Sequence, residues 1–254
     1  MNLFDLTGRV AIVTGGNGGI GLAMASGMAE AGASIVVAGR NAEKSAAAVD
    51  RLKGLGAEAI QVKVDVTDDD ACRAMVATAH DAFGRLDILV NNAGTNIRKQ
   101  PEEYTSAEWS TVIETNLTSA FQCSQAAYPA MCDAGGGKIV NIGSMMSIFG
   151  AAFATPYAAS KGGLVQATKA LATAWAKDNI QVNSVLPGWI DTDLTKQARR
   201  DVEGLHEKVE GRTPAGRWGV PEDLSGIAVF LASPASDFIT GTAIPVDGGF
   251  SVQG

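Results

Sequence analysis

Several residue types that mark specialised sites are scarce in this 254-residue sequence. It holds only two histidines, His80 and His206, and three widely spaced cysteines, Cys72, Cys123 and Cys132. This scarcity argues against a transition-metal site, which needs clustered ligands, and against a disulfide framework, which needs paired cysteines. Thiols that are few, odd in number and without a Cys-x-x-Cys motif favour a reducing cytoplasm instead.

Long hydrophobic runs and an excess of positive charge are also missing. No apolar run approaches the length of a transmembrane helix, and the first residues, MNLFDLTGRV, lack the basic-then-apolar pattern of a signal peptide. The net charge of −7 argues against nucleic acid or an anionic membrane as the main partner, because both favour a basic surface. We therefore expect a cytoplasmic protein that acts on a small molecule.

What the sequence does contain is a regular alternation of two kinds of segment. Short runs rich in Val and Ile predict strands buried on both faces, and helical patterns lie between most of them. The predicted strands are 10–14, 34–38, 59–66, 86–91, 137–142, 180–187 and 242–247, and the predicted helices are 19–31, 42–53, 68–83, 106–132 and 157–177. Strand alternating with helix predicts a single doubly wound α/β domain over residues 1–254, with seven parallel strands and helices on both faces.

Local signals refine this pattern at three places. Gly32 follows the first helix where a C-terminal cap belongs, and Thr67 is predicted to be the N-cap of the third helix, with acidic residues in its first turn. Residues 188–220 are glycine-rich and hold no clear strand, so they form either a lid or a disordered insertion. A position just after the carboxyl end of a strand favours the lid, since ligands bind at that edge of an open sheet.

The glycine-rich string TGGNGGIG, residues 14–21, follows the first predicted strand and opens the first predicted helix. Such strings are often plain turns, but this context favours a dinucleotide pyrophosphate bound at a helix N-terminus. An acidic residue at the end of the second strand would select NAD, whereas Arg40 stands there. An arginine attracts a 2′-phosphate, so we favour NADP, with NAD possible; otherwise Arg40 is a solvated loop residue.

Tyr157 and Lys161 lie one helical turn apart in YAASK. Alone, the pair is most simply a half-buried tyrosine beside a solvated lysine. An ammonium beside a phenol also favours the phenolate and lowers its pKa toward neutral pH. Such a phenol exchanges a proton with an alcohol while a hydride moves to or from nicotinamide.

Other motifs in the same chain decide between these two interpretations of the pair. TGGNGGIG, NNAG at 91–94, Asn116 in IETNLTSAF, Ser144 in VNIGS, YAASK and PGWIDT at 187–192 occur in this order in one chain. Together they resemble the short-chain dehydrogenase/reductase family, and the resemblance runs from GRVAIVTGG to GTAIPVDGG. It implies a Rossmann fold and a catalytic set of Asn116, Ser144, Tyr157 and Lys161.

The resemblance also implies how each catalytic residue acts. Ser144 would hydrogen-bond the reacting oxygen, and Asn116 would hold a water that links Lys161 to solvent. Lys161 would also contact the nicotinamide ribose. Taken alone, Ser144 is equally a strand-end serine, and Asn116 a buried side chain bonded to the backbone.

The family pattern further assigns residues to the cofactor. Asp65 would lie at the adenine, although it could simply begin a loop, and Thr192 would hold the carboxamide, although it could be a helix N-cap. The full cofactor set by resemblance is Gly15, Asn17, Gly19, Ile20, Gly21, Arg40, Asp65, Val66, Asn92, Ala93, Gly94, Tyr157, Lys161, Pro187, Gly188, Ile190 and Thr192.

The substrate is indicated by the loop TNIRKQP, residues 95–101, directly after NNAG. Its basic pair, Arg98 and Lys99, resembles the gluconate 5-dehydrogenase and 2-deoxygluconate 3-dehydrogenase branch of the family, and it suits a small carboxylate unless the loop is solvated. We expect a sugar acid to be bound by Arg98, Ser144, Met146, Tyr157 and Trp189, with Met145 beside them unless the methionines are core filler. The alternatives are a 3-oxoacyl thioester reductase and a non-catalytic dinucleotide-binding regulator.

Two helices carry more apolar residues than one sheet face needs, among them Leu164, Leu171 and Trp175. In the family the helices that match 106–132 and 157–177 pair across a two-fold axis. The resemblance therefore implies a homotetramer.

Overall fold

The structure, a computed structural model, describes residues 3–253 and contains the predicted seven-stranded parallel sheet. The strand order is β3-β2-β1-β4-β5-β6-β7, and each neighbouring pair is parallel. The third, fourth and seventh strands are shorter than the sequence pattern predicts. The strands are β1 (Val10–Thr14), β2 (Ser34–Gly39), β3 (Ala59–Lys63), β4 (Ile88–Asn91), β5 (Gly137–Ile142), β6 (Ile180–Pro187) and β7 (Ala243–Val246).

The central strand β1 shows why these runs are apolar throughout. Its side chains alternate between the two faces of the sheet. Ala11 and Val13 belong to one hydrophobic cluster and Val10 and Ile12 to the other, and all four are buried. A strand covered on both faces cannot place a polar side chain on either face without desolvating it, so its sequence reads as a continuous hydrophobic run.

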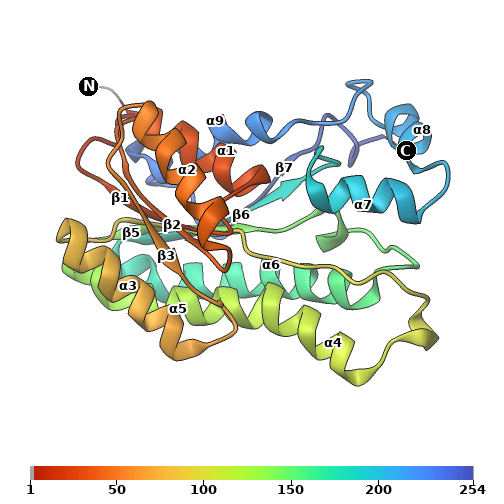
Figure 1. The fold of residues 1–254 in the computed structure, drawn as a ribbon, viewed down its shortest axis with the longest axis horizontal. Coiled ribbons are helices and arrows are strands. Elements are labelled where there is room, and N and C mark those ends of the chain that lie inside the picture. The colour runs from red at the N-terminus through yellow and green to blue at the C-terminus, as the bar shows by residue number, and fades with distance from the viewer. Residues whose placement is uncertain (1–2, 254) are drawn as a thin grey trace.

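Helices cover both faces of the sheet, as expected for a doubly wound fold (Figure 1). One face is covered by α1 (Gly19–Glu30), α2 (Ala42–Gly54) and α9 (Ser225–Ala232), and the other by α3 (Asp69–Phe83), α5 (Ser119–Asp133) and α6 (Thr155–Trp175). Helix α4 (Ser106–Ile113) precedes α5, while α7 (Asp193–Asp201) and α8 (Leu205–Arg212) lie near the carboxyl ends of the strands.

Two local predictions need correction. The N-cap of α3 is Asp68, whose carboxylate accepts a hydrogen bond from the Ala71 N–H at 3.1 Å, whereas the Thr67 hydroxyl donates to Asp65. The carboxylate is the stronger acceptor for a free amide, so it takes the capping place. The helix predicted over 106–132 is interrupted by a π-helical turn over 114–118. The glycine at the C-terminal end of α1 is as predicted: Gly32 has a φ of +102° and directly follows the C-cap residue Ala31.

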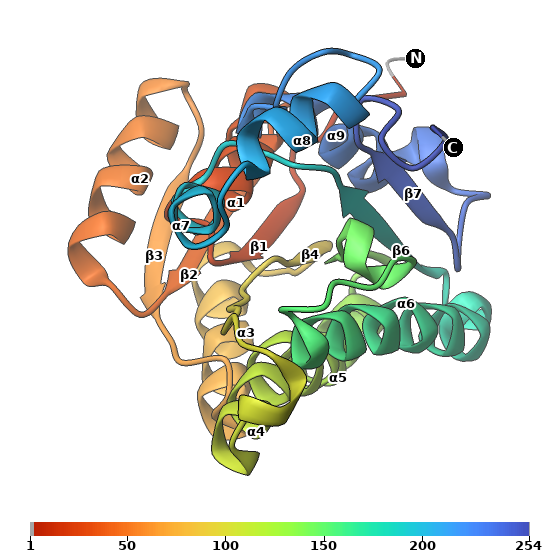
Figure 2. The same cartoon turned by 90° about the vertical axis from the view of Figure 1, so that its right-hand side faces the viewer.

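The segment predicted to be a lid contains two helices. Both α7 and α8 lie at the carboxyl edge of the sheet, on the same side as α1 (Figure 2). Ala198, Leu205, Val209 and Trp218 form a small hydrophobic cluster of their own in this segment, apart from the two clusters against the sheet. The sequence pattern missed these helices because each buries only one or two apolar side chains, and because Gly204 and Gly211 flank or interrupt the short α8.

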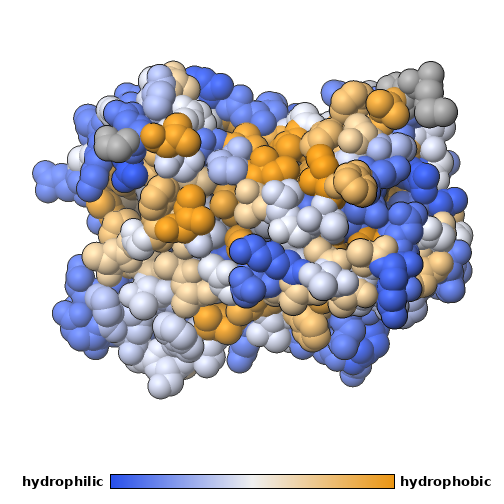
Figure 3. Space-filling model, turned by 180° about the vertical axis from the view of Figure 1, so that it is seen from behind, coloured by the Kyte–Doolittle hydropathy of each residue, from blue (hydrophilic) through white to orange (hydrophobic). Residues whose placement is uncertain are grey.

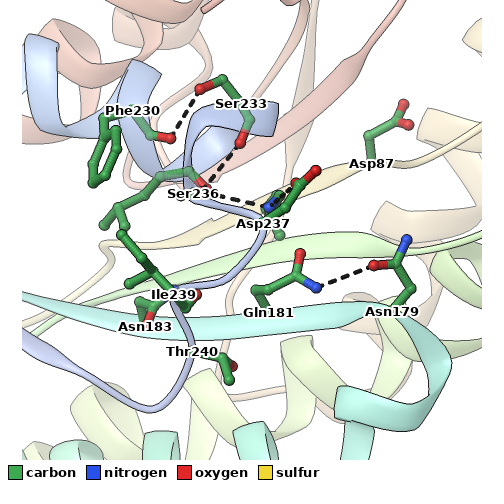
Figure 4. Close-up of polar contacts among 12 residues, drawn as sticks. Asp87, Asn179, Gln181, Asn183, Phe230, Ser233, Ser236, Asp237, Ile239 and Thr240 are labelled. Carbon is green, nitrogen blue, oxygen red and sulfur yellow. Dashed lines mark hydrogen bonds and ion pairs between the residues drawn. The ribbon is translucent and has the colours of Figure 1, made fainter. Parts of the chain in front are cut away.

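The opposite, amino edge of the sheet is tied by polar contacts in the segment between α9 and β7 (Figure 4). The Ser236 hydroxyl hydrogen-bonds the Ser233 carbonyl, and Asn183 of β6 donates to the Ile239 carbonyl at 2.8 Å. The largely buried Lys138 ammonium meets the Asp237 carboxylate at 2.8 Å. These contacts fix where the chain turns into β7, and they leave the carboxyl edge as the place for a ligand.

Candidate active site

A cavity of about 570 Å³ opens at the carboxyl edge of the sheet. It lies where strand order reverses between β1 and β4, the usual ligand position in doubly wound folds. Most residues predicted for the site line it. Of the predicted set, the cavity is lined by Gly15, Asn17, Gly19, Ile20, Asn92, Ala93, Gly94, Arg98, Ser144, Met146, Tyr157, Lys161, Pro187, Gly188, Trp189, Ile190 and Thr192.

The glycine-rich string forms one wall because it must pass very close to the turn after β4. The Asn92 side chain donates to the Thr14 and Gly15 carbonyls at 3.0 and 3.2 Å. Gly15 has a φ of +64°, and a Cβ there would lie 2.8 Å from the Asn92 amide nitrogen. Gly21 does not line the cavity; a Cβ on it would lie 2.5 Å from the Gly15 oxygen, so its place is a packing contact. In the described part of the chain no side chain caps the start of α1, which leaves its N–H groups for an anion.

The residues predicted for the adenine end lie outside the cavity walls. Arg40 follows β2, and its side chain is 76% exposed, with its guanidinium 4.0 Å from the Asp65 carboxylate. Two hydrogen bonds from Thr67 lower the pKa of Asp65. The Val66 side chain is buried in the core, so only its backbone is available to a ligand.

The predicted catalytic residues Ser144, Tyr157 and Lys161 converge in the cavity. Tyr157 and Lys161 project from the first turns of α6, and the Lys161 Nζ lies 5.7 Å from the centre of the Tyr157 ring. Ser144 stands just after β5, where its hydroxyl accepts a hydrogen bond from the Met146 N–H. The Ser147 hydroxyl donates to the Lys161 carbonyl at 2.9 Å, which holds the Ser144 turn against α6.

The protonation of this pair differs from the sequence prediction. Burial raises the pKa of Tyr157, against the opposing effects of a hydrogen bond with Ser144 and the charge of Arg98. Burial also lowers the pKa of Lys161 to about 8. The expected lowering of the phenol pKa by Lys161 is not found, because the lysine Nζ donates to the Ile142 carbonyl at 2.6 Å and desolvation outweighs the attraction between the charges.

Asn116 does not line the cavity but stands directly behind its wall. It lies in the π-helical turn before α5 and is almost completely buried. Its amide accepts from the Thr95 N–H at 2.7 Å and donates to the Thr95 carbonyl at 2.9 Å. A Cβ on Gly94 would lie 3.2 Å from the Asn116 oxygen and 3.7 Å from the Lys161 Nζ, so Asn116 and Lys161 meet at Gly94.

The two basic residues of the 95–101 loop lie in different environments. The Arg98 side chain is only 12% exposed, and its guanidinium is held by long contacts to Asp201 at 3.4 Å and to the Leu194 carbonyl at 3.3 Å. Lys99 turns away from the cavity to Glu108, 2.5 Å away, and this contact helps to lower the pKa of Glu108 to about 2. Of this basic pair, Arg98 is therefore the residue that lines the cavity.

Further residues line the cavity although the sequence did not single them out. Lys44, in the first turn of α2, lines it and lies 4.0 Å from Asp193 of α7. Asn96 and Phe153 line it near Arg98 and Tyr157. The only signal for Lys44 and Asn96 is their nearness to Arg40 and Arg98, because no motif marks them.

Residues 3–253 offer neither a ready cluster of metal ligands nor a membrane span. No cluster of three or more His, Cys, Asp or Glu side chains is arranged there to hold a metal ion. None of the helices of this range combines the length and the apolar character needed to cross a membrane.

The chain is similar to known proteins over almost its whole length. The family described as Enoyl-(Acyl carrier protein) reductase matches residues 15–251. The 2-dehydro-3-deoxy-D-gluconate 5-dehydrogenase of Dickeya dadantii is 42% identical, over 98% of each chain, and the gluconate 5-dehydrogenase of Gluconobacter oxydans is 41% identical, over 99% of this chain and 98% of its own.

A solved structure has the same fold. The gluconate 5-dehydrogenase of Burkholderia cenocepacia, in complex with NADP and tartrate, superposes with a TM-score of 0.94 at 40% identity, covering 99% of this chain and 98% of its own. These matches confirm the resemblance drawn from the motifs. With its parallel sheet, its glycine-rich turn and its Ser144, Tyr157 and Lys161 in one cavity, the chain belongs to the short-chain dehydrogenase/reductase family of NAD(P)-dependent oxidoreductases.

Proposed function

We propose that this enzyme moves a hydride between NADP and a secondary alcohol or ketone carbon of a small, gluconate-like sugar acid. The observation that carries the proposal is the Arg98 guanidinium, which lines the same cavity as Ser144 and Tyr157 and acts on the pKa of Tyr157. A guanidinium binds a carboxylate through two parallel hydrogen bonds. The relatives named for gluconate and its 3-deoxy derivative support this class of substrate.

The cavity fits a dinucleotide. Gly18 and Gly19 line the cavity and present only backbone to it, and the uncapped start of α1 offers N–H groups to a pyrophosphate. When bound, the nicotinamide ring accepts or supplies the hydride. Arg40 directly precedes the N-cap of α2 and Lys44 lies in its first turn, and two cations there suit a 2′-phosphate. The relative in complex with NADP supports this choice, with NAD as the weaker candidate.

The roles proposed for the catalytic residues follow from their positions. The Tyr157 hydroxyl exchanges the proton with the substrate oxygen, and its raised pKa keeps it protonated and ready to donate to a forming alkoxide. Ser144 hydrogen-bonds the same oxygen and fixes its place. Lys161, which is largely protonated at neutral pH, places a positive charge next to the Tyr157 ring. Asn116 positions the wall at Thr95.

Arg98 is arranged to exchange its present partners for a substrate carboxylate. Both contacts, to Asp201 and to the Leu194 carbonyl, are longer than the usual 2.7–2.9 Å of a charge-assisted hydrogen bond. An incoming carboxylate can offer two oxygens in better geometry. Because Asp201 and Leu194 belong to α7, this exchange would also change how α7 is held over the cavity, as a lid requires.

The proposal is tested by turnover of a panel of aldonic acids, neutral polyols and a 3-oxoacyl thioester with each cofactor. We expect turnover of an aldonate or its keto form with NADP, and turnover of the thioester alone would overturn the proposal. Tyr157→Phe should lower kcat by about 10² to 10⁴ with the Kd for NADP retained. Tyr128→Phe is the matched control, because that phenol bonds Asp178 and does not line the cavity.

The proposed assembly is a cytoplasmic homotetramer, each chain acting as one catalytic unit over residues 1–254. Two of the apolar residues on the predicted pairing helices make contacts within the chain instead. Leu164 is buried, and Trp175 packs on Tyr128 with ring centres 4.9 Å apart. Better support comes from Phe121, nearly half exposed on α5, and from the fully exposed Phe238.

Hydrophobic side chains also reach the surface across the middle of the face turned away from the viewer in Figure 1 (Figure 3). Large exposed apolar groups of this kind commonly mark contacts between chains. A monomeric mass in light scattering at micromolar concentration would contradict the tetramer.

A further inference from the structure

The segment after β4, residues 94–99, has two different sides. Gly94, Asn96 and Arg98 line the cavity, whereas the residues between them do not. This alternation is that of an extended chain, in which successive side chains point to opposite sides. One edge of the segment is therefore presented to the ligand at every second residue.

The other side of the segment is anchored to the protein. Asn116 clamps the Thr95 backbone through two hydrogen bonds. The Tyr104 hydroxyl donates to the Ile97 carbonyl at 2.7 Å and accepts from the Lys99 N–H at 3.3 Å. Anchors on each alternate residue fix the register, so the side chains that face the cavity are held there by the backbone.

Asn96 is the one cavity-facing residue of this segment whose polar side chain has no partner within residues 3–253. Its Oδ1 is buried yet accepts no hydrogen bond. Turning the amide over would only exchange the buried oxygen for a buried nitrogen. A buried polar atom without a partner is unfavourable, and such an atom persists at a binding site when a ligand supplies the missing partner.

We propose that Asn96 binds a hydroxyl group of the substrate chain and thereby selects a polyhydroxylated acid. This inference rests on the proposed function. Asn96 and Arg98 are two residues apart, which in an extended chain separates their side chains by about 7 Å. That distance spans several carbons of a small sugar acid. With the substrate carboxylate bound to Arg98, the Asn96 amide hydrogen-bonds one hydroxyl group farther along the substrate. That hydroxyl lies between the carboxylate and the reacting carbon, which is held at Tyr157 and Ser144.

The experiment compares wild type and Asn96→Ala on an aldonic acid and on its 2-deoxy and 3-deoxy analogues. Asn96→Ala should lower kcat/KM for the full aldonate about three- to tenfold, as expected for one neutral hydrogen bond. It should have no further effect on the analogue that lacks the recognised hydroxyl. Lys99→Met is the matched control on the same segment, since Lys99 turns away from the cavity to Glu108, and it should not alter the discrimination.

Two further measurements separate recognition from other roles. The melting temperature of Asn96→Ala should not fall, because the side chain has no hydrogen-bond partner to lose within residues 3–253. The Kd for NADP should also stay unchanged; a weaker NADP Kd would assign Asn96 to the cofactor and overturn the inference.

The outcomes for the inference and for the proposed function are distinct. Equal losses on the aldonate and on both deoxy analogues, or no loss on any, would refute hydroxyl recognition while leaving the sugar-acid function standing. If wild type turned over no sugar acid at all, the proposed function would fail, and hydroxyl recognition by Asn96 would fail with it.

Discussion

Replacing Lys161 by methionine should change how the stability of the protein depends on pH. The lysine side chain is only 4% exposed, and burial lowers its pKa from 10.5 to about 8. Its ammonium also donates to the Ile142 carbonyl. Methionine keeps most of the side-chain volume but removes the titrating group, so only the charge and this hydrogen bond are lost.

The sign follows from proton binding in the two states. Below pH 8 the folded and the unfolded chain both hold the lysine proton, and the full penalty of burying the charge is present. Between about pH 8 and 10.5 the folded chain has released the proton while the unfolded chain keeps it, so the free energy of unfolding rises with pH. The pKa difference corresponds to about 3 kcal/mol in all, of which about 2 kcal/mol is gained between roughly pH 7 and 9.5.

The assay is urea unfolding of wild type, Lys161→Met and Lys169→Met at these two pH values. The free energy of unfolding of wild type minus that of Lys161→Met should grow by about 2 kcal/mol from the lower to the higher pH. The lost bond to Ile142 adds a nearly constant offset and cancels in this difference. Lys169, exposed on the same helix, controls for loss of a surface charge and should track wild type. A difference that stays constant with pH would refute the burial argument.

Three further predictions test the cofactor turn, the cofactor choice and the substrate. Gly21→Ala should destabilise the protein by about 1–3 kcal/mol, since the added methyl group would lie 2.5 Å from a backbone oxygen. Gly18→Ala is the control: its methyl group would have no neighbour within 4 Å among the described residues, so the melting temperature should stay unchanged. Arg40→Ala should raise the KM for NADP about tenfold and leave that for NAD unchanged; an equal effect on both would remove Arg40 from the 2′-phosphate. Arg98→Ala should lower kcat/KM for an acidic substrate by about one to two powers of ten and leave kcat/KM for a neutral polyol unchanged. Arg98→Lys should recover part of the lost activity on the acidic substrate. Equal losses on both substrates would indicate a disturbed loop.

The sheet could be predicted because its signals are local. A strand covered on both faces must be apolar at each position, and β1, β5 and β6 begin and end where the Val- and Ile-rich runs do. The glycine-rich turn could also be predicted from the sequence, since contacts as close as that between Gly15 and Asn92 leave no room for a side chain. The capping residue of α3 could not be predicted in this way. Thr67 and Asp68 are both good caps, and only the geometry of the carboxylate decides between them.

The candidate site was predictable as a set of residues but not as an arrangement of charges. The sequence by itself brought Tyr157 and Lys161 to one face of a helix and marked Arg98 as a substrate cation, because spacing and residue type suffice for both. Only the tertiary structure decided that Lys161 bonds the Ile142 carbonyl, that Arg98 is held by α7, and that the buried Asn96 Oδ1 has no hydrogen-bond partner among the described residues. Desolvation and partner choice depend on segments far apart in the sequence, so periodicity and motifs do not determine them.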